Sequence, residues 1–255
     1  LNGRHCSEVQ DYQSSHATRG TVEILLICKA LHYGGLSDQL VLLEVPSYTR
    51  ALMEAEKGLL AMSAETVWRR DVKHQKFHIS DPIFNKREFT KGFFVEAHRQ
   101  TEFERQLGPP TKRKAIHLLR QHVLVSSAHW VLDWELITAL GIPVLNVPKS
   151  KNMCQMIKAG RAEVYFGELV MNGEADLAYQ CAGIRLVPIR GIKTKLYESR
   201  HFVVSKQYPN SDKIFKALQT GIKALAANGE LKTAIYPYQT NKQRIDQWLT
   251  LNANP

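Results

Sequence analysis

The alternation of secondary structure is clearest in residues 39–69, which read QLVLLEVPSYTRALMEAEKGLLAMSAETVWR. The apolar run 39–45 predicts a buried strand, and the proline and serine after it open a helix that Gly58 closes. Residues 59–62 are short and apolar enough for the next strand. Strands that alternate with helices in this way favour an α/β unit with a mainly parallel sheet.

The alternation extends in both directions along the chain. Upstream, residues 21–33 form an apolar run long enough for a helix, with Gly34 as its stop signal. Downstream, a second series of strands and helices occupies residues 122–189, and an amphipathic helix is expected over 212–227. The sequence therefore predicts two α/β units.

A polar region separates the two series. Residues 98–115 contain a Gly-Pro-Pro turn and the basic triplet Lys112-Arg113-Lys114, a composition typical of a boundary, and we interpret the triplet as part of a solvated linker. Two segments of similar, β-rich composition, 92–97 and 201–206, lie where the chain could cross between the units.

Composition excludes several classes of protein. The chain has 255 residues, of which 44% are apolar and 23% charged, so it is neither disordered nor collagen-like. No run approaches the ~20 apolar residues that a membrane span needs. The net charge of +10 suggests that the protein binds nucleic acid or meets other anionic ligands or surfaces. The charges are spread over loops and helix faces without an aromatic and basic platform, so we expect no nucleic-acid binding.

The four cysteines, Cys6, Cys28, Cys154 and Cys181, contain no C-x-x-C pair. They could form two bridges in an oxidising compartment or stay buried and reduced. A chain of this length does not need disulfides to be stable, which favours the reduced state. The chain begins at Leu1 with no signal-like segment, and we expect it to be a processed product.

Common catalytic and metal-binding motifs are absent from the sequence, including P-loop, dinucleotide-binding, nucleophile-elbow and H-E-x-x-H patterns. Ser127, His129 and Asp133 are close in sequence, but a small polar turn explains them better than a catalytic triad. His74 and His78 are four residues apart without a third ligand nearby, which favours a solvated loop over a metal site. We expect no cofactor and no metal.

Two segments place charged side chains where a strand ends. Residues 58–69 run from an expected strand into a loop that carries Thr66 and Arg69, and residues 159–168 run through another strand to Glu168. Ligands are commonly held at the carboxyl ends of strands in α/β sheets, and the arginine fork suits a carboxylate. An arginine and an acid together would suit a zwitterion such as an amino acid, although either residue could be an ordinary surface charge.

Residues 58–83, 156–168 and 202–231, in this order, resemble the type 2 periplasmic solute-binding proteins. The resemblance is to the extracellular family 3 group, which includes amino-acid receptors of ABC transporters. It implies two α/β lobes joined by two crossing strands, with the ligand in a cleft between the lobes. The implied boundaries are 1–95 plus 203–255 for lobe 1, 96–202 for lobe 2, and a hinge near 92–97 and 200–206.

The resemblance also implies roles for individual residues. Arg69, with Thr66, would grip the α-carboxylate of the ligand, and Glu168 would grip its α-amino group. The implied hydroxyl or amide donors are Ser126 and Ser127, and the candidates for an aromatic cover over the ligand are Tyr12, Trp68 and Trp130.

The resemblance implies a monomeric, non-catalytic protein that is exported to the periplasm. It would bind a small polar solute by hinge closure and present it to an ABC permease. Two alternatives stay open. The chain could be the ligand-binding domain of a membrane sensor, or a lyase-like enzyme on the same scaffold that uses Glu168 or His129 as its acid or base.

Overall fold

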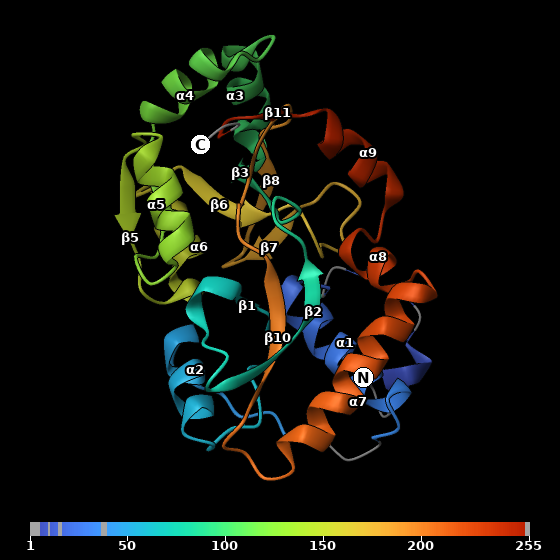
Figure 1. Ribbon diagram of the computed structural model, residues 1–255. Coiled ribbons are helices and arrows are strands. Elements are labelled where there is room, and N and C mark those ends of the chain that lie inside the picture. Colours follow the sequence, from blue (N-terminus) through green and yellow to red (C-terminus); the bar gives the residue numbers. More distant parts are fainter. Residues whose placement is uncertain (1–5, 10, 15–16, 37–39, 253–255) are drawn as a thin grey trace. The chain divides into compact units, whose positions relative to one another are not determined.

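The computed structural model describes residues 6–9, 11–14, 17–36 and 40–252, and the chain divides into two compact units (Figure 1). Unit 1 comprises Leu1–Phe89 and Tyr197–Pro237, and unit 2 comprises Thr90–Leu196 and Tyr238–Pro255. The chain therefore passes between the units three times.

These units differ from the predicted lobes at the C-terminus. Residues 238–255, which the sequence assigned to lobe 1, belong to unit 2, because β11 (Leu249–Thr250) pairs in parallel with β9 (Ile192–Lys195). The predicted hinge segments 92–97 and 200–206 overlap β3 (Thr90–Glu96) and β10 (Arg200–Ser205) except for their last residues, and each strand lies in the sheet of one unit.

The helices of unit 1 follow local sequence signals. The expected helix over 21–33 is confirmed as α1 (Arg19–Tyr33), which begins earlier, after Thr18, and ends at Gly34. It packs on α7 (Ser211–Ala227), as Figure 1 shows. The two backbones touch at Gly221, where a Cβ atom would lie 1.8 Å from the carbonyl oxygen of Ala30. Glycine at this position therefore permits the contact between the helices.

The sheet of unit 1 corrects the sequence prediction. Its strands β1 (Val67–Trp68), β10 and β2 (Phe77–Phe84) are antiparallel. The strand expected over 39–45 is wrong for residues 40–45, which form none, and Gln39 lies outside the described residues. Residues 59–62 contribute only a bridge from Met62 to Val204. An apolar run becomes a strand only when a neighbour pairs with its backbone. The side chains of residues 40–43 are instead exposed.

The other elements of unit 1 are short. The predicted helix after Ser47 is confirmed. The Ser47 hydroxyl accepts a hydrogen bond from the Arg50 amide at 3.2 Å and so caps the N-terminus of this helix. The remaining bounds are η1 (Cys6–Glu8), α2 (Tyr48–Glu56), η2 (Arg69–Asp71) and α8 (Glu230–Ile235).

Unit 2 is built on an eight-stranded mixed sheet of the described residues, with the order β11-β9-β3-β6-β4-β5; β8 also pairs with β3, and β7 pairs with β8. Strands β6, β4 and β5 are parallel, as the second alternation predicts. The buried core includes Phe93, Leu124 and Phe166. Bounds not yet given are β4 (Leu124–Ser126), β5 (Val144–Asn146), β6 (Val164–Glu168), β7 (Tyr179–Cys181), β8 (Ile184–Pro188), η3 (Ala97–Arg99), α5 (Val131–Ala139), η4 (Ser150–Asn152), α6 (Met153–Lys158) and α9 (Gln239–Gln247).

The predicted linker over 98–115 is wrong. These residues contain α3 (Gln100–Leu107) and the start of α4 (Lys112–Arg120). The Thr111 hydroxyl accepts the Lys114 amide at 3.3 Å, and Phe103 is among the side chains buried in the core of unit 2. Apolar residues at helical spacing are enough to form buried helices here, although the composition of the segment is polar. The basic triplet forms the exposed first turn of α4.

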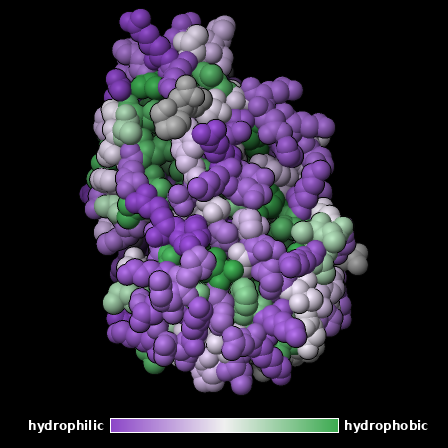
Figure 2. Space-filling view, in the orientation of Figure 1, coloured by the Kyte–Doolittle hydropathy of each residue, from purple (hydrophilic) through white to green (hydrophobic). Residues whose placement is uncertain are grey.

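Both cysteine pairs form disulfides, Cys6–Cys28 in unit 1 and Cys154–Cys181 in unit 2. The preference for reduced cysteines is therefore wrong, because the spacing of the cysteines says nothing of which ones meet in space. Among the described helices, none is long and apolar enough to cross a membrane. The face in Figure 2 is covered mostly by hydrophilic residues, with smaller apolar patches between them.

Candidate functional site

The unit 1 candidates Thr66, Trp68 and Arg69 lie together at β1 and the start of η2. Thr66 is fully buried. Its hydroxyl donates to Glu23 Oε1 at 2.5 Å and accepts from Arg200 Nε at 2.7 Å. Both hydrogen-bonding roles of this hydroxyl are therefore used inside unit 1, and Thr66 holds the strand that leads to Arg69.

Glu23 and Arg200 complete a buried network that sequence reasoning missed. Glu23 also pairs with Arg19 at 2.8 Å, and the Arg200 guanidinium lies 4.3 Å from the centre of the Trp68 ring. Burial raises the pKa of the Glu23 carboxyl, against the effect of the two arginines, and burial lowers the pKa of Arg200. The one sequence signal was Glu23 itself, an acid in the otherwise apolar run 22–28.

Arg69 is half-buried, and its backbone is anchored, because its amide donates to Ser199 O at 3.0 Å. Its Nη1 donates to Val72 O at 3.0 Å, and its Nη2 contacts His74 Nε2. A guanidinium has five N–H donors, so these contacts leave donors for a bound carboxylate.

In unit 2, Ser126 ends β4 and Glu168 ends β6, two neighbouring parallel strands. The carboxyl ends of parallel strands meet at the same edge of a sheet, so the fold brings these two candidates to one edge. Ser127 follows directly in the turn before α5. Its hydroxyl accepts the His129 amide at 3.3 Å, and its carbonyl accepts the Trp130 amide at 3.0 Å.

Lys91 is a further residue of this group that sequence reasoning missed. It lies opposite Glu168 in the β3–β6 register, forms an ion pair with Asp133 in the first turn of α5, and has its Nζ 4.0 Å from Glu168 Oε1. The ammonium also lies 5.5 Å from the centre of the Trp130 ring. Only the register of β3 on β6 reveals that Lys91 lies next to Glu168.

The two carboxylates of the group differ in exposure. The side chains of Lys91, Asp133 and Glu168 are 3%, 7% and 20% exposed, so solvent screens them poorly. Asp133 is the more buried of the two carboxylates and forms the ion pair with Lys91, whereas the Glu168 carboxylate is the more exposed and also lies 3.4 Å from the Tyr179 hydroxyl. The more exposed carboxylate, Glu168, is therefore the one suited to a second cation.

The Ser126 hydroxyl is also buried, and among the described residues it has no hydrogen-bond partner; the Thr90 hydroxyl is in the same state. Buried polar groups are nearly always hydrogen-bonded. A hydroxyl without a partner among the described residues, at the same sheet edge as Glu168, is a group that a bound solute could satisfy.

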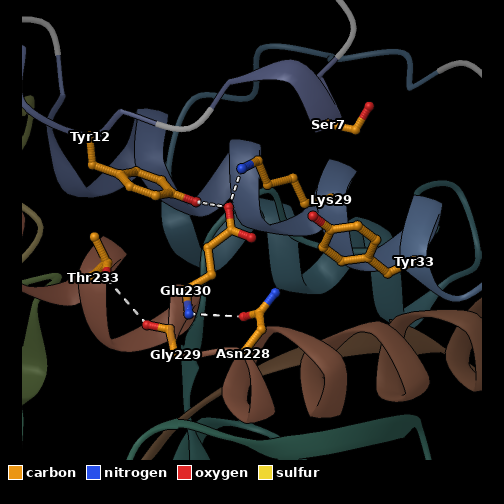
Figure 3. Close-up of a pocket in the computed structure, with 8 residues that line it drawn as sticks. All are labelled: Ser7, Tyr12, Lys29, Tyr33, Asn228, Gly229, Glu230 and Thr233. Carbon is orange, nitrogen blue, oxygen red and sulfur yellow. Dashed lines mark hydrogen bonds and ion pairs between the residues drawn. The ribbon is translucent and has the colours of Figure 1, made fainter.

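Tyr12 lies in a different place from the other unit 1 candidates (Figure 3). Its hydroxyl donates to Glu230 Oε1 at 3.0 Å, and burial and the Glu230 carboxylate raise its pKa. The pocket around Glu230 has a volume of about 470 Å³, and none of Thr66, Trp68 and Arg69 lines it. A role of Tyr12 beside Arg69 stays a prediction.

The residues of the two sequence patterns, the histidine pair and the serine, histidine and aspartate, have other contacts in the part of the chain that the structure describes. Across the described ranges, no group of three or more His, Cys, Asp or Glu side chains could hold a metal ion. His74 contacts Arg69, whereas His78 lies 3.3 Å from Asp212. Asp133 forms an ion pair with Lys91.

No family model and no curated protein sequence matches the chain. Solved structures do. An amino acid ABC transporter substrate-binding protein from Streptococcus pneumoniae, bound to L-arginine, has a TM-score of 0.57 at 13% identity, over 84% of this chain and 80% of that one. ArgBP from T. maritima, in a mutant form, has a TM-score of 0.55 at 14% identity, over 86% and 85%.

A third similar structure is the BvgS periplasmic VFT2 domain of Bordetella pertussis, with a TM-score of 0.57 at 11% identity, over 85% of this chain and 83% of that one. Identities this low establish the fold alone. The chain has the two-lobed α/β fold of the type 2 periplasmic solute-binding proteins.

Proposed function

We propose that the protein is a non-catalytic solute-binding protein for a small, amino-acid-like solute that carries a carboxylate. The observation that carries the proposal is the pair Ser126 and Glu168 at the carboxyl ends of adjacent parallel strands. Asp133 is the direct partner of Lys91, and the Glu168 carboxylate at this strand end is the more exposed of the two acids and suits the ammonium of a solute. The shared fold with proteins bound to L-arginine supports this ligand class.

Each candidate residue has a chemical role in the proposal. Glu168 accepts the ammonium of the solute, and the hydroxyls of Ser126 and Ser127 hydrogen-bond to its polar groups. Arg69 binds the carboxylate through charge-assisted hydrogen bonds. Trp68 and Trp130 supply aromatic surface, and Thr66 positions Arg69 through the buried network of unit 1.

The cellular role follows from the fold class. We propose an exported, periplasmic, monomeric protein that closes around its solute and presents it to an ABC permease. The likeness to the BvgS domain favours a second candidate, the ligand-binding domain of a membrane sensor. Fractionation of cells that express the full coding sequence separates the two. Recovery with the periplasmic contents supports the free receptor, and recovery with the membranes supports the sensor.

A thermal-shift screen tests the ligand class. The panel consists of amino acids, dicarboxylates and polyamines, because a ligand that binds only the folded state raises its melting temperature. We expect a shift with amino acids, and a response to polyamines alone would contradict the proposal.

Calorimetry with the best ligand then tests the site. Arg69→Ala should weaken binding by roughly 10- to 100-fold, since a hydrogen bond to a charged group is worth about 1.5–3 kcal/mol. The neighbouring exposed Arg70→Ala is the matched control and should leave the affinity unchanged. Unchanged affinity in Arg69→Ala would remove that residue from the site.

A further inference from the structure

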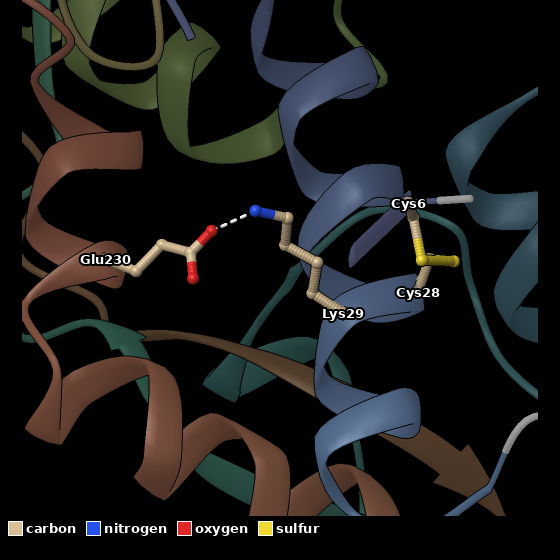
Figure 4. Close-up of a disulfide and its surroundings, with 4 residues drawn as sticks. All are labelled: Cys6, Cys28, Lys29 and Glu230. Atoms are coloured by element: carbon tan, nitrogen blue, oxygen red, sulfur yellow. Dashed lines mark hydrogen bonds and ion pairs between the residues drawn. A yellow bond between two sulfur atoms is a disulfide. The ribbon is translucent and has the colours of Figure 1, made fainter. Parts of the chain in front are cut away.

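The N-terminal part of unit 1, residues 6–9 and 11–13, is here named the strap. At one end it is covalently attached, because the disulfide between Cys6 and Cys28 joins η1 to α1 (Figure 4). Cys6 is almost fully buried, at 1% exposure. The strap is therefore fastened to the helix at the residue that precedes Lys29.

At its other end the strap holds α8 and the residue where the chain leaves unit 1. The Tyr12 hydroxyl donates to Glu230 Oε1 at 3.0 Å, and Gln13 Nε2 donates to Pro237 O at 3.0 Å. Lys29, buried in α1, forms an ion pair with the same Glu230 oxygen and lies 5.5 Å from the centre of the Tyr12 ring. Figure 3 shows the phenol and the ammonium converging on this carboxylate.

The segment that is held in this way has little stability of its own. Helix α8 has six residues, Glu230–Ile235, and a helix this short depends on tertiary contacts. Pro237 is the last residue of unit 1, and the chain enters unit 2 at Tyr238. The contacts from the strap thus act on one of the three connections between the units.

We propose that the strap is a redox-sensitive clamp on residues 230–237. The disulfide restricts the strap, since it closes a loop with a sequence separation of 22 residues. A dithiol reductant would transfer two electrons and two protons to this bond, giving two cysteine thiols and the oxidised, disulfide form of the reagent. The strap would then keep only its non-covalent contacts, and Glu230 would lose part of its support. The proposal does not depend on the identity of the solute.

Hydrogen–deuterium exchange of the whole chain tests the clamp. In Cys6→Ser/Cys28→Ser, and in wild-type protein treated with a dithiol, the amides of residues 230–236 should exchange about tenfold faster or more. The matched control is Cys154→Ser/Cys181→Ser, which removes the disulfide between α6 and β7 in unit 2. This control should leave the exchange of 230–236 unchanged.

Two outcomes would overturn the proposal. One is unchanged exchange of residues 230–236 without the Cys6–Cys28 bond. The other is faster exchange throughout unit 1, which would make the bond a general stabiliser. Tyr12→Phe keeps both disulfides and removes only the hydroxyl that binds Glu230, so it tests the clamp even if the cysteine variant does not fold. It should speed exchange in 230–236 by a smaller factor, and no change there would equally contradict the clamp.

Discussion

Two clusters of buried charge, one in each unit, differ in how completely they are paired. In unit 1, Glu23, Thr66 and Arg200 satisfy one another: the carboxylate accepts from both the amide and the hydroxyl of Thr66, and that hydroxyl accepts from the guanidinium. In unit 2, Lys91 pairs with Asp133, while Glu168 keeps a more exposed carboxylate and the Ser126 hydroxyl has no partner among the described residues.

The difference separates a structural role from a binding role. A buried charge is tolerated when hydrogen bonds and an opposite charge compensate it. The unit 1 cluster meets this condition within the protein, so its residues are expected to stabilise the fold. The unit 2 cluster differs because it contains the Ser126 hydroxyl, which has no partner among the described residues, and a more exposed carboxylate, Glu168. These two groups are the ones that we propose contact a solute.

The largest effect is expected from a break in the unit 1 network. Glu23→Met leaves Arg200 buried without a nearby buried carboxylate, which should lower the free energy of unfolding by about 3–5 kcal/mol. The control is Glu65→Gln, since Glu65 pairs with Arg19 at 3.0 Å on a side chain that is 42% exposed. It should cost less than about 1 kcal/mol in urea unfolding. Equal losses in the two variants would refute the structural role.

A second pair of variants tests whether the two acids of unit 2 differ. Asp133→Asn removes the direct partner of buried Lys91 and should cost about 3 kcal/mol in urea unfolding. Glu168→Gln should cost less than about 1 kcal/mol, because Lys91 keeps Asp133, and Tyr179 keeps its 2.7 Å hydrogen bond to the Glu168 carbonyl. The reverse order of the two losses would assign the structural role to Glu168.

The pH dependence of stability tests the buried ammonium of Lys193. Lys193 donates to the carbonyls of Ile245 and Asp246, and burial lowers its pKa from 10.5 to about 8. Between these values the unfolded state binds more protons than the folded state, so stability should rise with pH. The slope is at most about 1.4 kcal/mol per pH unit for one proton.

The measurement compares urea unfolding of wild-type protein and Lys193→Met from pH 7.5 to pH 9.5. Tyrosine phenols ionise only at about pH 10, above this range. The variant should lack this contribution to the slope. Identical slopes in the two proteins would contradict the lowered pKa.

The smallest expected effect is a difference in stability between the loss of a hydrogen-bonded serine hydroxyl and the loss of one without a partner. Ser126→Ala should leave stability within about 1 kcal/mol of wild type, or raise it, because it removes a buried hydroxyl without a partner among the described residues. Ser205 in unit 1 is equally buried, but its hydroxyl accepts the Gln207 amide at 3.2 Å. Ser205→Ala should therefore cost about 1 kcal/mol. A larger loss in Ser126→Ala would show that its hydroxyl is bonded within the protein.

Sequence patterns predicted the helices better than the strands. The helices α1, α2 and α7 were predictable because periodicity, caps and stop signals act within a few residues of one another. The apolar run 40–45 carried a strand signal just as clear, yet no strand forms there. A strand depends on a partner elsewhere in the chain, which a local pattern cannot supply.

The same contrast holds for the candidate site. The strand-end positions of Ser126 and Glu168 follow from the local alternation, whereas Lys91 joins them only through the pairing of β3 with β6. Likewise, nothing near Thr66 in the sequence indicates Arg200, which lies 134 residues away.

By itself, the sequence determined the α/β class, most of the helices and the chemical types available for binding. The tertiary structure decided which cysteines are bonded, which charges are buried together, and which hydroxyl is left without a partner. The reason is physical. Helix propensity and capping are local free energies, whereas the desolvation of a charge and its compensation depend on groups that meet only when the chain has folded.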